Sequence, residues 1–270
     1  MTCLKTSRGV VELRELQSIT DMEKAEQIQV RVWGLETLPC PKEMLIPVQH
    51  EGGLAAGAFD GDEMIGLVFS FSTRDPAVHH SQLLATLTEW RGMGIGTALK
   101  WFQRRWCLEH GITQVRWTVD PLRAANANIN IQHLGGVSST YLIDYYGKMQ
   151  GIDAGAPTDR LLLEWNLKSL RVEARCNGGV ADPGYPEAEY ANELEAGIPK
   201  VIKKGLKSPQ ILIRIPTNFL EVSRNQPDLA LNWRLSTREL FLDTFERGYA
   251  IAEFTRIGGP AYLLEARKTE

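Results

Sequence analysis

The sequence has few of the features that mark disulfide-rich, metal-stapled or membrane-spanning proteins. Its 270 residues contain four cysteines with no CxxC spacing, so neither a structural zinc site nor a disulfide framework is expected. No apolar run approaches the roughly 20 residues that cross a bilayer. The first eight residues also lack the apolar core of a signal peptide. We therefore expect a cytoplasmic protein with no membrane partner and no metal.

An excess of one charge is also missing. The chain has 30 Lys and Arg against 33 Asp and Glu, which gives a net charge of −3. Proteins that bind the phosphate backbone of nucleic acids usually carry a basic patch or stripe, so we expect no nucleic-acid partner. Hydrophobic residues make up 43% of the chain, enough for one large core or two small ones.

Apolar periodicity and turn residues predict a mixed α/β domain over residues 1–170. A helix should follow Thr20, because Thr20 and Glu23 have the spacing of a capping box. Asp60-Gly61-Asp62, between two apolar runs, predicts a hairpin. The other predicted elements are strands at 10–16, 81–87, 114–119, 141–146 and 160–167 and helices at 96–109 and 125–134.

The remaining residues change in character. Residues 171–209 are rich in Gly, Pro and Glu and are predicted to be an exposed connection. Residues 210–270 predict a smaller α+β subdomain with a long helix at 227–247, which has Pro227 in its first turn. This part has no glycine-rich loop of its own. A degenerate second half, a lid over a substrate slot and a dimer surface all fit it, so a homodimer is one expectation.

The most informative segment is the glycine-rich run from Arg91 to Ala98, between a predicted strand and a predicted helix. Glycines let an anion approach the backbone, and the first turn of a helix offers unpaired N–H groups and the positive end of a dipole. A plain strand-to-helix turn is one alternative. A P-loop would need GxxxxGK[ST], and a dinucleotide-binding turn would need GxGxxG near the chain start.

The spacing Arg91-x-x-Gly94-x-Gly96 matches the Q/R-x-x-G-x-G/A acyl-CoA loop, and residues 84–96 as a whole resemble the GNAT superfamily of acyl-CoA N-acyltransferases. The resemblance covers about residues 10–168, and the whole chain looks most like a two-part branch of predicted GNAT proteins. It implies an α/β fold with a mixed, mostly antiparallel central sheet flanked by helices. The 210–270 segment would be a smaller α+β part.

The resemblance also implies how an acyl-CoA would bind. Backbone amides from Met93 to Ala98 would hold the pyrophosphate, and the strand from Leu84 to Thr86 would line up with pantetheine. The sheet would splay after this strand, and Asn126 or Asn130 would direct an amide toward the pantetheine arm. The candidate acyl-CoA-binding residues are Leu84, Ala85, Thr86, Arg91, Gly92, Met93, Gly94, Ile95, Gly96, Thr97, Ala98, Asn126 and Asn130.

Acyl transfer to an amine needs a neutral nucleophile, a polarised thioester carbonyl and a proton for the leaving thiolate. In the superfamily a tyrosine often supplies that proton, but the matching position here is Ile131. Tyr146 or Tyr145, at the end of a predicted strand, is the candidate donor, and simple packing is the alternative role. His80 is the candidate base. The alternative is that His79 and His80 are solvated polar residues.

We therefore expect an N-acyltransferase that moves an acetyl or other short acyl group from acyl-CoA to a small amine such as an amino acid. A succinyl donor is a further option. Direct attack is expected, because no Cys is placed beside a His. Two alternatives stay open: a non-catalytic acyl-CoA sensor, which Ile131 favours, and a phosphate-loop protein that binds another nucleotide.

Overall fold

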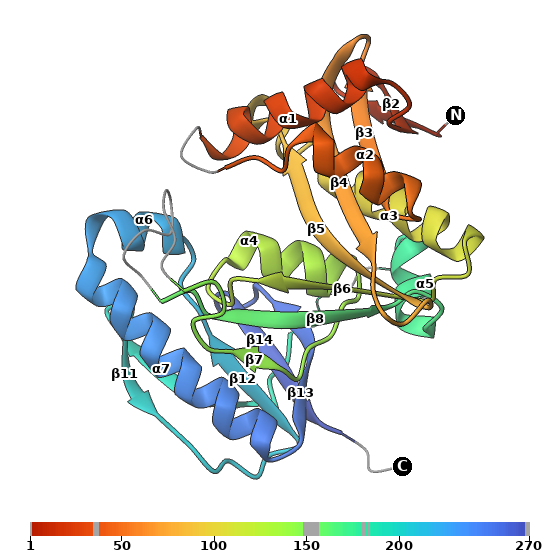
Figure 1. The fold of residues 1–270 in the computed structure, drawn as a ribbon. Helices are drawn as coiled ribbons and strands as arrows, with labels where there is room; N and C mark the ends of the chain where they lie inside the picture. Colours follow the sequence, from red (N-terminus) through yellow and green to blue (C-terminus); the bar gives the residue numbers. More distant parts are fainter. Residues whose placement is uncertain (1, 35–37, 148–156, 180–181, 183, 268–270) are drawn as a thin grey trace. The chain divides into compact units, whose positions relative to one another are not determined.

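The computed structural model in Figure 1 describes residues 2–34, 38–147, 157–179, 182 and 184–267. Contacts divide the chain into two compact units. Unit 1 comprises Met1–Trp117, Gln150–Ile152 and Asn166–Lys168, and unit 2 comprises Thr118–Met149, Asp153–Trp165 and Ser169–Glu270. Within the described ranges, no helix combines the length and apolar character that crossing a membrane requires.

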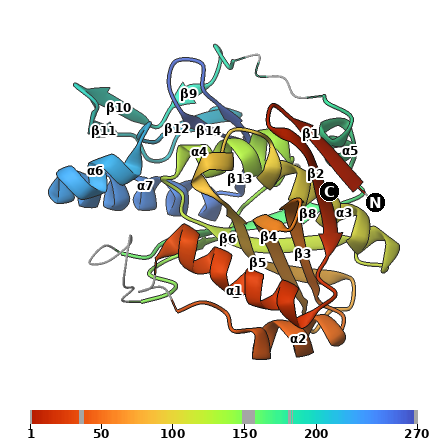
Figure 2. The ribbon, with the colours of Figure 1, turned by 90° about the horizontal axis from the view of Figure 1, so that it is seen from above.

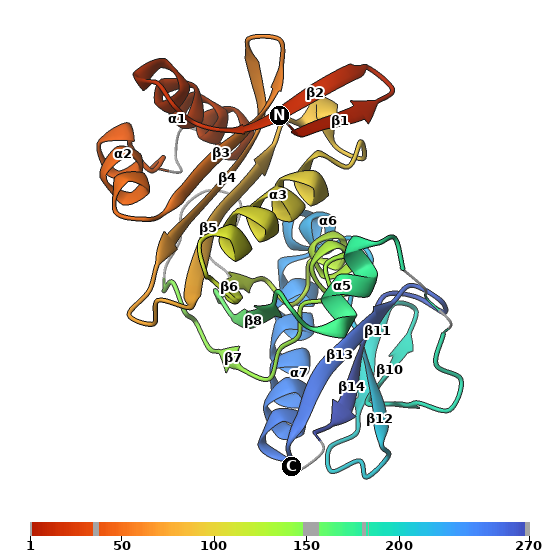
Figure 3. The ribbon, with the colours of Figure 1, turned by 90° about the vertical axis from the view of Figure 1, so that its right-hand side faces the viewer.

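Unit 1 is built on an antiparallel sheet with one parallel strand at its edge. Strands β1 to β5 follow one another as antiparallel neighbours, and β6 pairs parallel with β5. Figures 2 and 3 show α1 and α2 on one face of this sheet and α3 on the other. The elements are β1 (Thr2–Thr6), β2 (Gly9–Glu15), α1 (Ile19–Trp33), α2 (Lys42–His50), β3 (Leu54–Asp60), β4 (Glu63–Ser72), β5 (Val78–Thr86), the 3₁₀ turn η1 (Thr88–Trp90), α3 (Ile95–Glu109) and β6 (Gln114–Val119).

The first helix begins earlier than the sequence indicated. Ser18 is the N-cap of α1, and its hydroxyl accepts a hydrogen bond from the Asp21 backbone N–H at 3.1 Å. The predicted capping box at Thr20 is therefore wrong, because Thr20 already lies inside the helix. Asp21 also accepts two hydrogen bonds from Arg14, which lowers the pKa of its carboxyl to about 2. This bidentate pair ties the start of α1 to β2.

Gly66 of β4 allows α3 to pack closely against the sheet. A Cβ atom at Gly66 would lie 2.9 Å from side-chain atoms of both Ile95 and Leu99, closer than carbon atoms can approach. Ile95 and Leu99 are buried, as are Phe102 and Trp106 farther along the helix. The apolar side of this helix thus faces the sheet. Gly66 fixes where the start of α3 lies relative to β4.

Unit 2 combines the end of the predicted α/β region with the whole C-terminal segment. Its main sheet has the strand order β13-β14-β12-β9, and Figures 1 and 3 show α7 lying along it. The elements are α4 (Ala124–Ala127), the π-helical turn η2 (Asn128–His133), β7 (Tyr141–Leu142), β8 (Arg160–Asn166), α5 (Leu170–Cys176), β9 (Glu189–Tyr190), β10 (Asn192–Glu195), β11 (Ile198–Ile202), β12 (Gln210–Arg214), α6 (Phe219–Asn225), α7 (Pro227–Glu246), β13 (Tyr249–Thr255) and β14 (Ala261–Ala266).

The C-terminal segment shares contacts with residues 118–165 throughout unit 2. Tyr262 of β14 donates a hydrogen bond to the Pro121 carbonyl at 2.9 Å, and Ser138 forms a β-bridge with Ile251. Both contacts join residues that are more than a hundred positions apart in the chain. The mixed α/β fold with a mostly antiparallel sheet is confirmed. The sequence predicts an acyl-CoA-binding domain at 1–170, a connection at 171–209 and a C-terminal subdomain at 210–270. This division stays a prediction.

Candidate functional site

The glycine-rich run forms the turn between β5 and α3, as its composition indicated. Gly92 and Gly94 have φ angles of +79° and +80°, and Gly94 is the left-handed N-cap of α3. A Cβ atom built at either glycine would meet nothing within 4 Å. The backbone at both positions therefore faces open space. Glycine is favoured here by conformation, since most other residues are less stable in the left-handed region.

Backbone N–H groups at the start of α3 are available to a ligand. Ala98 makes the first intrahelical hydrogen bond, to the Gly94 carbonyl at 2.9 Å. The N–H groups from Ile95 to Thr97 precede it and belong to the turn that a helix leaves unpaired. Gly94 supplies no capping side chain, and the described residues of this first turn include no acidic side chain. The turn is thus suited to an anion.

The structure brings the turn and the strand before it together. A Cβ atom at Gly96 would lie 3.6 Å from Oγ1 of Thr86 and 3.8 Å from Cδ2 of Leu84, an ordinary contact distance. Trp90 is buried and anchors the η1 turn between them. Leu84, Thr86 and Gly96 are therefore neighbours in space. Ala85 alternates with them and is buried.

A bulge in β5 comes just before this stretch. Ser81 pairs with Ser70 of β4 and Leu83 pairs with Phe69, so Gln82 is an extra residue in β5. A bulge bends its strand and increases the local twist. The bulge also changes which side chains of β5 point to which face of the sheet. As a result, Leu84 and Thr86 lie on the same face as the start of α3. Simple alternation along the sequence could not have shown this.

The pairing between β5 and β6 ends at the same place. Within the described part of unit 1, Val78, His79 and His80 pair with Gln114, Val115 and Arg116 of β6. From Leu83 to Thr86 β5 stays paired with β4. The separation of the sheet after β5 that the sequence resemblance implied stays a prediction. Over this stretch, the side of β5 away from β4 is the side at which a pantetheine arm would lie.

The two histidines at the start of β5 have different surroundings. His79 is buried, so it is not a solvated polar residue, and burial together with the charge of His110 lowers its pKa to about 4. His80 stacks on Phe71 with ring centroids 5.1 Å apart. Burial and then the nearby Lys100 charge lower the pKa of His80 below its usual 6.5. A neutral imidazole at position 80 can accept a proton at neutral pH.

Lys100 of α3 is a polar group inside unit 1. Its side chain is buried, with 2% of the residue exposed. The ammonium donates to Oε1 of Gln103 at 2.7 Å and to Oγ of Ser81 at 3.1 Å, and it lies 3.8 Å from the ring centroid of Trp117. Burial lowers its pKa to about 7. Lys100 lies four residues after Gly96, so helical spacing places both residues on the same face of α3. This spacing is the sequence signal for the position of Lys100.

The asparagines and Ile131 lie in the α4 and η2 turns of unit 2. Asn126 is exposed, whereas Asn130 is buried and its carbonyl accepts a hydrogen bond from Gly136 N–H. The predicted helix at 125–134 is present, but its second half is wound as a π-helix. Ile131 is buried at 1% exposure. The position that often carries a tyrosine in the superfamily is thus a core position here.

Tyr145 and Tyr146 lie in a turn, so the predicted strand at 141–146 is limited to its first two residues. The strand stops because Asp144 adopts a left-handed φ of +46°. About half of each tyrosine is exposed. The Tyr146 hydroxyl lies 2.9 Å from Oγ1 of Thr118, and its ring is 5.3 Å from the guanidinium of Arg160. Both phenols are therefore accessible.

These groups are divided between the two units. The Arg91–Ala98 turn, the 84–86 strand and His80 belong to unit 1, whereas Asn126, Asn130 and the two tyrosines belong to unit 2. The structure therefore brings the loop and strand residues together within unit 1. Among the described residues, no group of three or more His, Cys, Asp or Glu is placed to hold a metal ion.

Solved structures that resemble this chain include several acetyltransferases, all of low sequence identity. The alanine N-acetyltransferase of ribosomal protein S18 from Escherichia coli is 16% identical, with a TM-score of 0.49 over 65% of this chain and 99% of its own. Ard1 from Thermoplasma volcanium is 21% identical, with a TM-score of 0.45 over 57% and 95%. A GNAT acetyltransferase from Streptococcus pneumoniae is 14% identical, with a TM-score of 0.49 over 57% and 98%. No curated protein matches the chain.

The sequence profile of the Acetyltransferase (GNAT) family matches residues 18–129, which contain β3 to β6, the glycine turn and α3. Enzymes of this family take their acyl group from acetyl-CoA or a related acyl-CoA. The open glycine turn at the start of α3 fits such a co-substrate, because it offers backbone donors without an acidic neighbour. Residues 18–129 of the chain thus match the GNAT acetyltransferase family, and this part carries the glycine turn.

Proposed function

We propose that this enzyme transfers an acetyl or other short acyl group to the amine of a small metabolite such as an amino acid. The observation that carries the proposal is the turn from Arg91 to Ala98. Its two left-handed glycines have open space above them, and the N–H groups that follow are not used by the helix. A pyrophosphate is the part of an acyl-CoA that such a turn would hold.

The strand from Leu84 to Thr86 would guide the rest of the co-substrate. Pantetheine contains two amides, and an extended β-strand can hydrogen-bond to them as it would to another strand. The bulge at Gln82 and the end of the β6 pairing support this role, because both lie immediately before the stretch. Asn126 is favoured over Asn130 for the amide contact, since Asn126 is exposed and Asn130 is buried.

In the proposed reaction, the acceptor amine attacks the thioester carbonyl, the C–N bond forms and the C–S bond breaks. His80 would take the proton that the amine loses, directly or through a water, because its lowered pKa keeps the imidazole neutral. Tyr146 would give a proton to the departing thiolate, with Tyr145 as the alternative donor. Direct transfer is favoured, since burial raises the pKa of the Cys107 thiol to about 12 and leaves it a poor nucleophile.

An acyl-CoA sensor without turnover is the second candidate, and buried Ile131 is the observation that favours it. The choice of acyl group belongs to the proposal as well, with succinyl as the alternative to acetyl. A cytoplasmic location is proposed because Cys3 is an exposed free thiol, which suits a reducing compartment. A homodimer stays a prediction.

Thiol release from acetyl-CoA and succinyl-CoA, measured with a panel of amino acids and other small amines, tests the proposal. An enzyme should release free coenzyme A only when a matching amine is present, in a one-to-one ratio with the acylated amine. Tight coenzyme A binding without transfer to any amine would favour the sensor. If ATP or NAD binds and coenzyme A does not, both candidates are wrong.

A further inference from the structure

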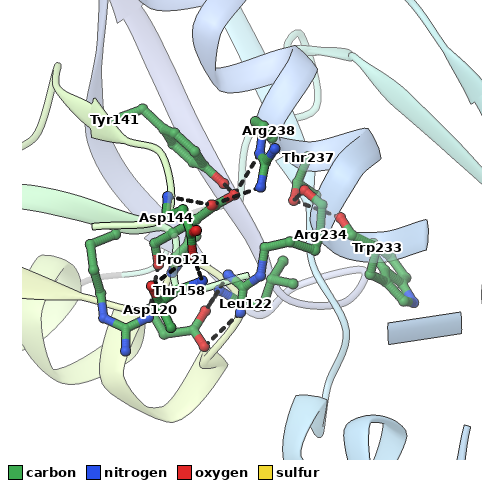
Figure 4. A network of polar contacts seen from close by, with 12 residues as sticks. Asp120, Pro121, Leu122, Tyr141, Asp144, Thr158, Trp233, Arg234, Thr237 and Arg238 are labelled. Atoms are coloured by element: carbon green, nitrogen blue, oxygen red, sulfur yellow. Dashed lines mark hydrogen bonds and ion pairs between the residues drawn. The ribbon is translucent and has the colours of Figure 1, made fainter. Parts of the chain in front are cut away.

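Helix α7 carries two arginines, four residues apart, that each hold a carboxylate from a distant part of unit 2 (Figure 4). Arg234 donates to both oxygens of Asp120 at 2.7 and 2.8 Å. Arg238 donates to both oxygens of Asp159 at 2.8 Å. Bidentate arginine–carboxylate pairs fix the relative orientation of their partners more firmly than single contacts.

Asp159 connects α7 to the turn that contains the two tyrosines. This carboxylate is fully buried, and its oxygens also accept the Tyr141 hydroxyl at 2.8 Å and the Asp144 backbone N–H at 3.0 Å. Asp144 has the left-handed φ of +46°, which a non-glycine residue keeps only where its surroundings impose it. The Arg238–Asp159 pair is part of those surroundings.

The next bonds reach the backbone of Tyr146. The Asp144 carboxylate accepts from both the N–H and the hydroxyl of Thr158 at 3.0 Å. Oγ1 of Thr158 then accepts the Tyr146 N–H at 3.1 Å, and its carbonyl accepts the Tyr145 N–H at 3.1 Å. A continuous chain of hydrogen bonds therefore joins Arg238 to the main chain of Tyr146.

The other end of Tyr146 is connected to the second arginine. The phenol hydroxyl lies 2.9 Å from Oγ1 of Thr118, in β6. Asp120, two residues later, ends this strand, accepts the Leu122 N–H at 2.9 Å and is held by Arg234. The two ion pairs of α7 are thus placed one beside each anchor of Tyr146: its backbone N–H and its hydroxyl.

We infer that α7 is a two-point clasp that orients the Tyr146 hydroxyl, and that Arg238 and Arg234 are positioning residues. The inference rests on the proposed role of Tyr146 as proton donor. It also gives the C-terminal part a task. Position 131 is an isoleucine in the core, and the chain instead presents a tyrosine on a turn whose geometry is held by a helix outside the matched region 18–129.

A double-mutant cycle between Arg238→Gln and Tyr146→Phe tests the clasp in the full-length protein. General acids contribute about 100-fold or more to such rates. We expect R238Q to lower kcat about 10-fold or more, with coenzyme A affinity unchanged, but to have no further effect in a chain that already carries Y146F. Arg247→Gln is the matched control, because it removes an arginine–carboxylate pair of α7, with Asp243, that has no link to the turn. Arg238→Lys keeps a positive charge beside buried Asp159 but loses the bidentate contact. This variant is used in place of R238Q if R238Q does not fold.

A second readout does not depend on turnover. The ¹⁹F resonance of 3-fluorotyrosine placed at position 146 should shift or broaden in R238Q and R238K but not in R247Q. An unchanged resonance, or an equal loss of kcat from R238Q in the wild-type and Y146F backgrounds, would overturn the clasp. Full activity of Tyr146→Phe alone would instead remove Tyr146 from the proposed reaction, and the positioning role would go with it.

Discussion

Replacing Arg234 with Met should destabilise unit 2 strongly, because it leaves the Asp120 carboxylate buried without its cation. Only 3% of the Arg234 side chain and 8% of the Asp120 side chain are exposed, and both hydrogen bonds are short. Removing one partner of a buried ion pair costs about 3–5 kcal/mol. Domains are stable by only about 5–15 kcal/mol, so the loss would be a large share of the total.

The effect should depend on pH in a defined direction. Burial raises the pKa of Asp120, but the hydrogen bonds and charge of Arg234 outweigh burial, so its pKa in the folded protein is lowered. The stabilisation it gives is therefore present above its unfolded pKa, about 3.9, and is lost as the pH falls through the folded pKa. In R234M burial is opposed only by the Leu122 N–H hydrogen bond and the charge of Arg160, so the pKa of the Asp120 carboxyl rises and its neutral form is favoured. The difference in stability between the wild type and R234M should thus narrow as the pH falls below about 4.

Urea unfolding followed by tryptophan fluorescence measures this, since buried Trp233 lies next to Arg234. The double variant D120N/R234M should recover part of the loss, because it removes the unpaired charge. Lys204→Gln, which breaks an exposed pair with Glu239 in the same unit, should leave the midpoint unchanged. A loss below about 1 kcal/mol in R234M, the range of exposed pairs, would contradict the reasoning. So would a double variant as unstable as the sum of the two single variants.

Three further outcomes follow from unit 1. Because the pKa of His80 is lowered, the transfer rate should stay constant as the pH falls to 6.5 and decline only below that pH. In a pH–rate profile, His80→Gln should lower the rate and flatten this decline. In the folded protein the pKa of Lys100 is lowered to about 7, so the free energy of unfolding should rise from pH 7 toward pH 10. Urea titrations of Lys100→Met should lack this rise. If the variant shows the same rise, other groups cause it. Gly66→Ala should cost about 1–3 kcal/mol in the same assay, since its Cβ would press on Ile95 and Leu99, and a neutral effect would mean that α3 can move away from β4.

The glycine turn and the main elements around it were predictable because their signals are local. The turn from Arg91 to Ala98 needs left-handed glycines and a helix start, and both follow from adjacent residues. The long helix with Pro227 in its first turn was equally clear. The bulge at Gln82 was not, because it arises from register between β5 and β4 and leaves no mark in the sequence of either strand.

Three buried or half-buried cations of the structure, Arg234, Arg238 and Lys100, leave no signal in the sequence that distinguishes them from exposed cations. Arg234 and Arg238 have the helical spacing of an ordinary exposed face, yet their partners Asp120 and Asp159 lie 114 and 79 residues away. Lysines are rarely buried, but Gln103 and Ser81 form polar contacts with Lys100 inside unit 1. Helical spacing alone cannot separate these cases.

The measurement that tests the central claim most directly is calorimetric titration of coenzyme A into the wild type, Gly94→Asp and Gly94→Asn. Asn tolerates the left-handed φ of Gly94 and matches Asp in shape, and open space surrounds its Cβ, so both variants should fold. One negative charge added about 6 Å from a phosphate charge makes the binding free energy of coenzyme A less favourable by about 1–3 kcal/mol for each such phosphate charge. The account predicts that G94D binds coenzyme A at least about 10-fold more weakly than G94N. Equal affinities for the two variants would show that the turn does not hold the pyrophosphate.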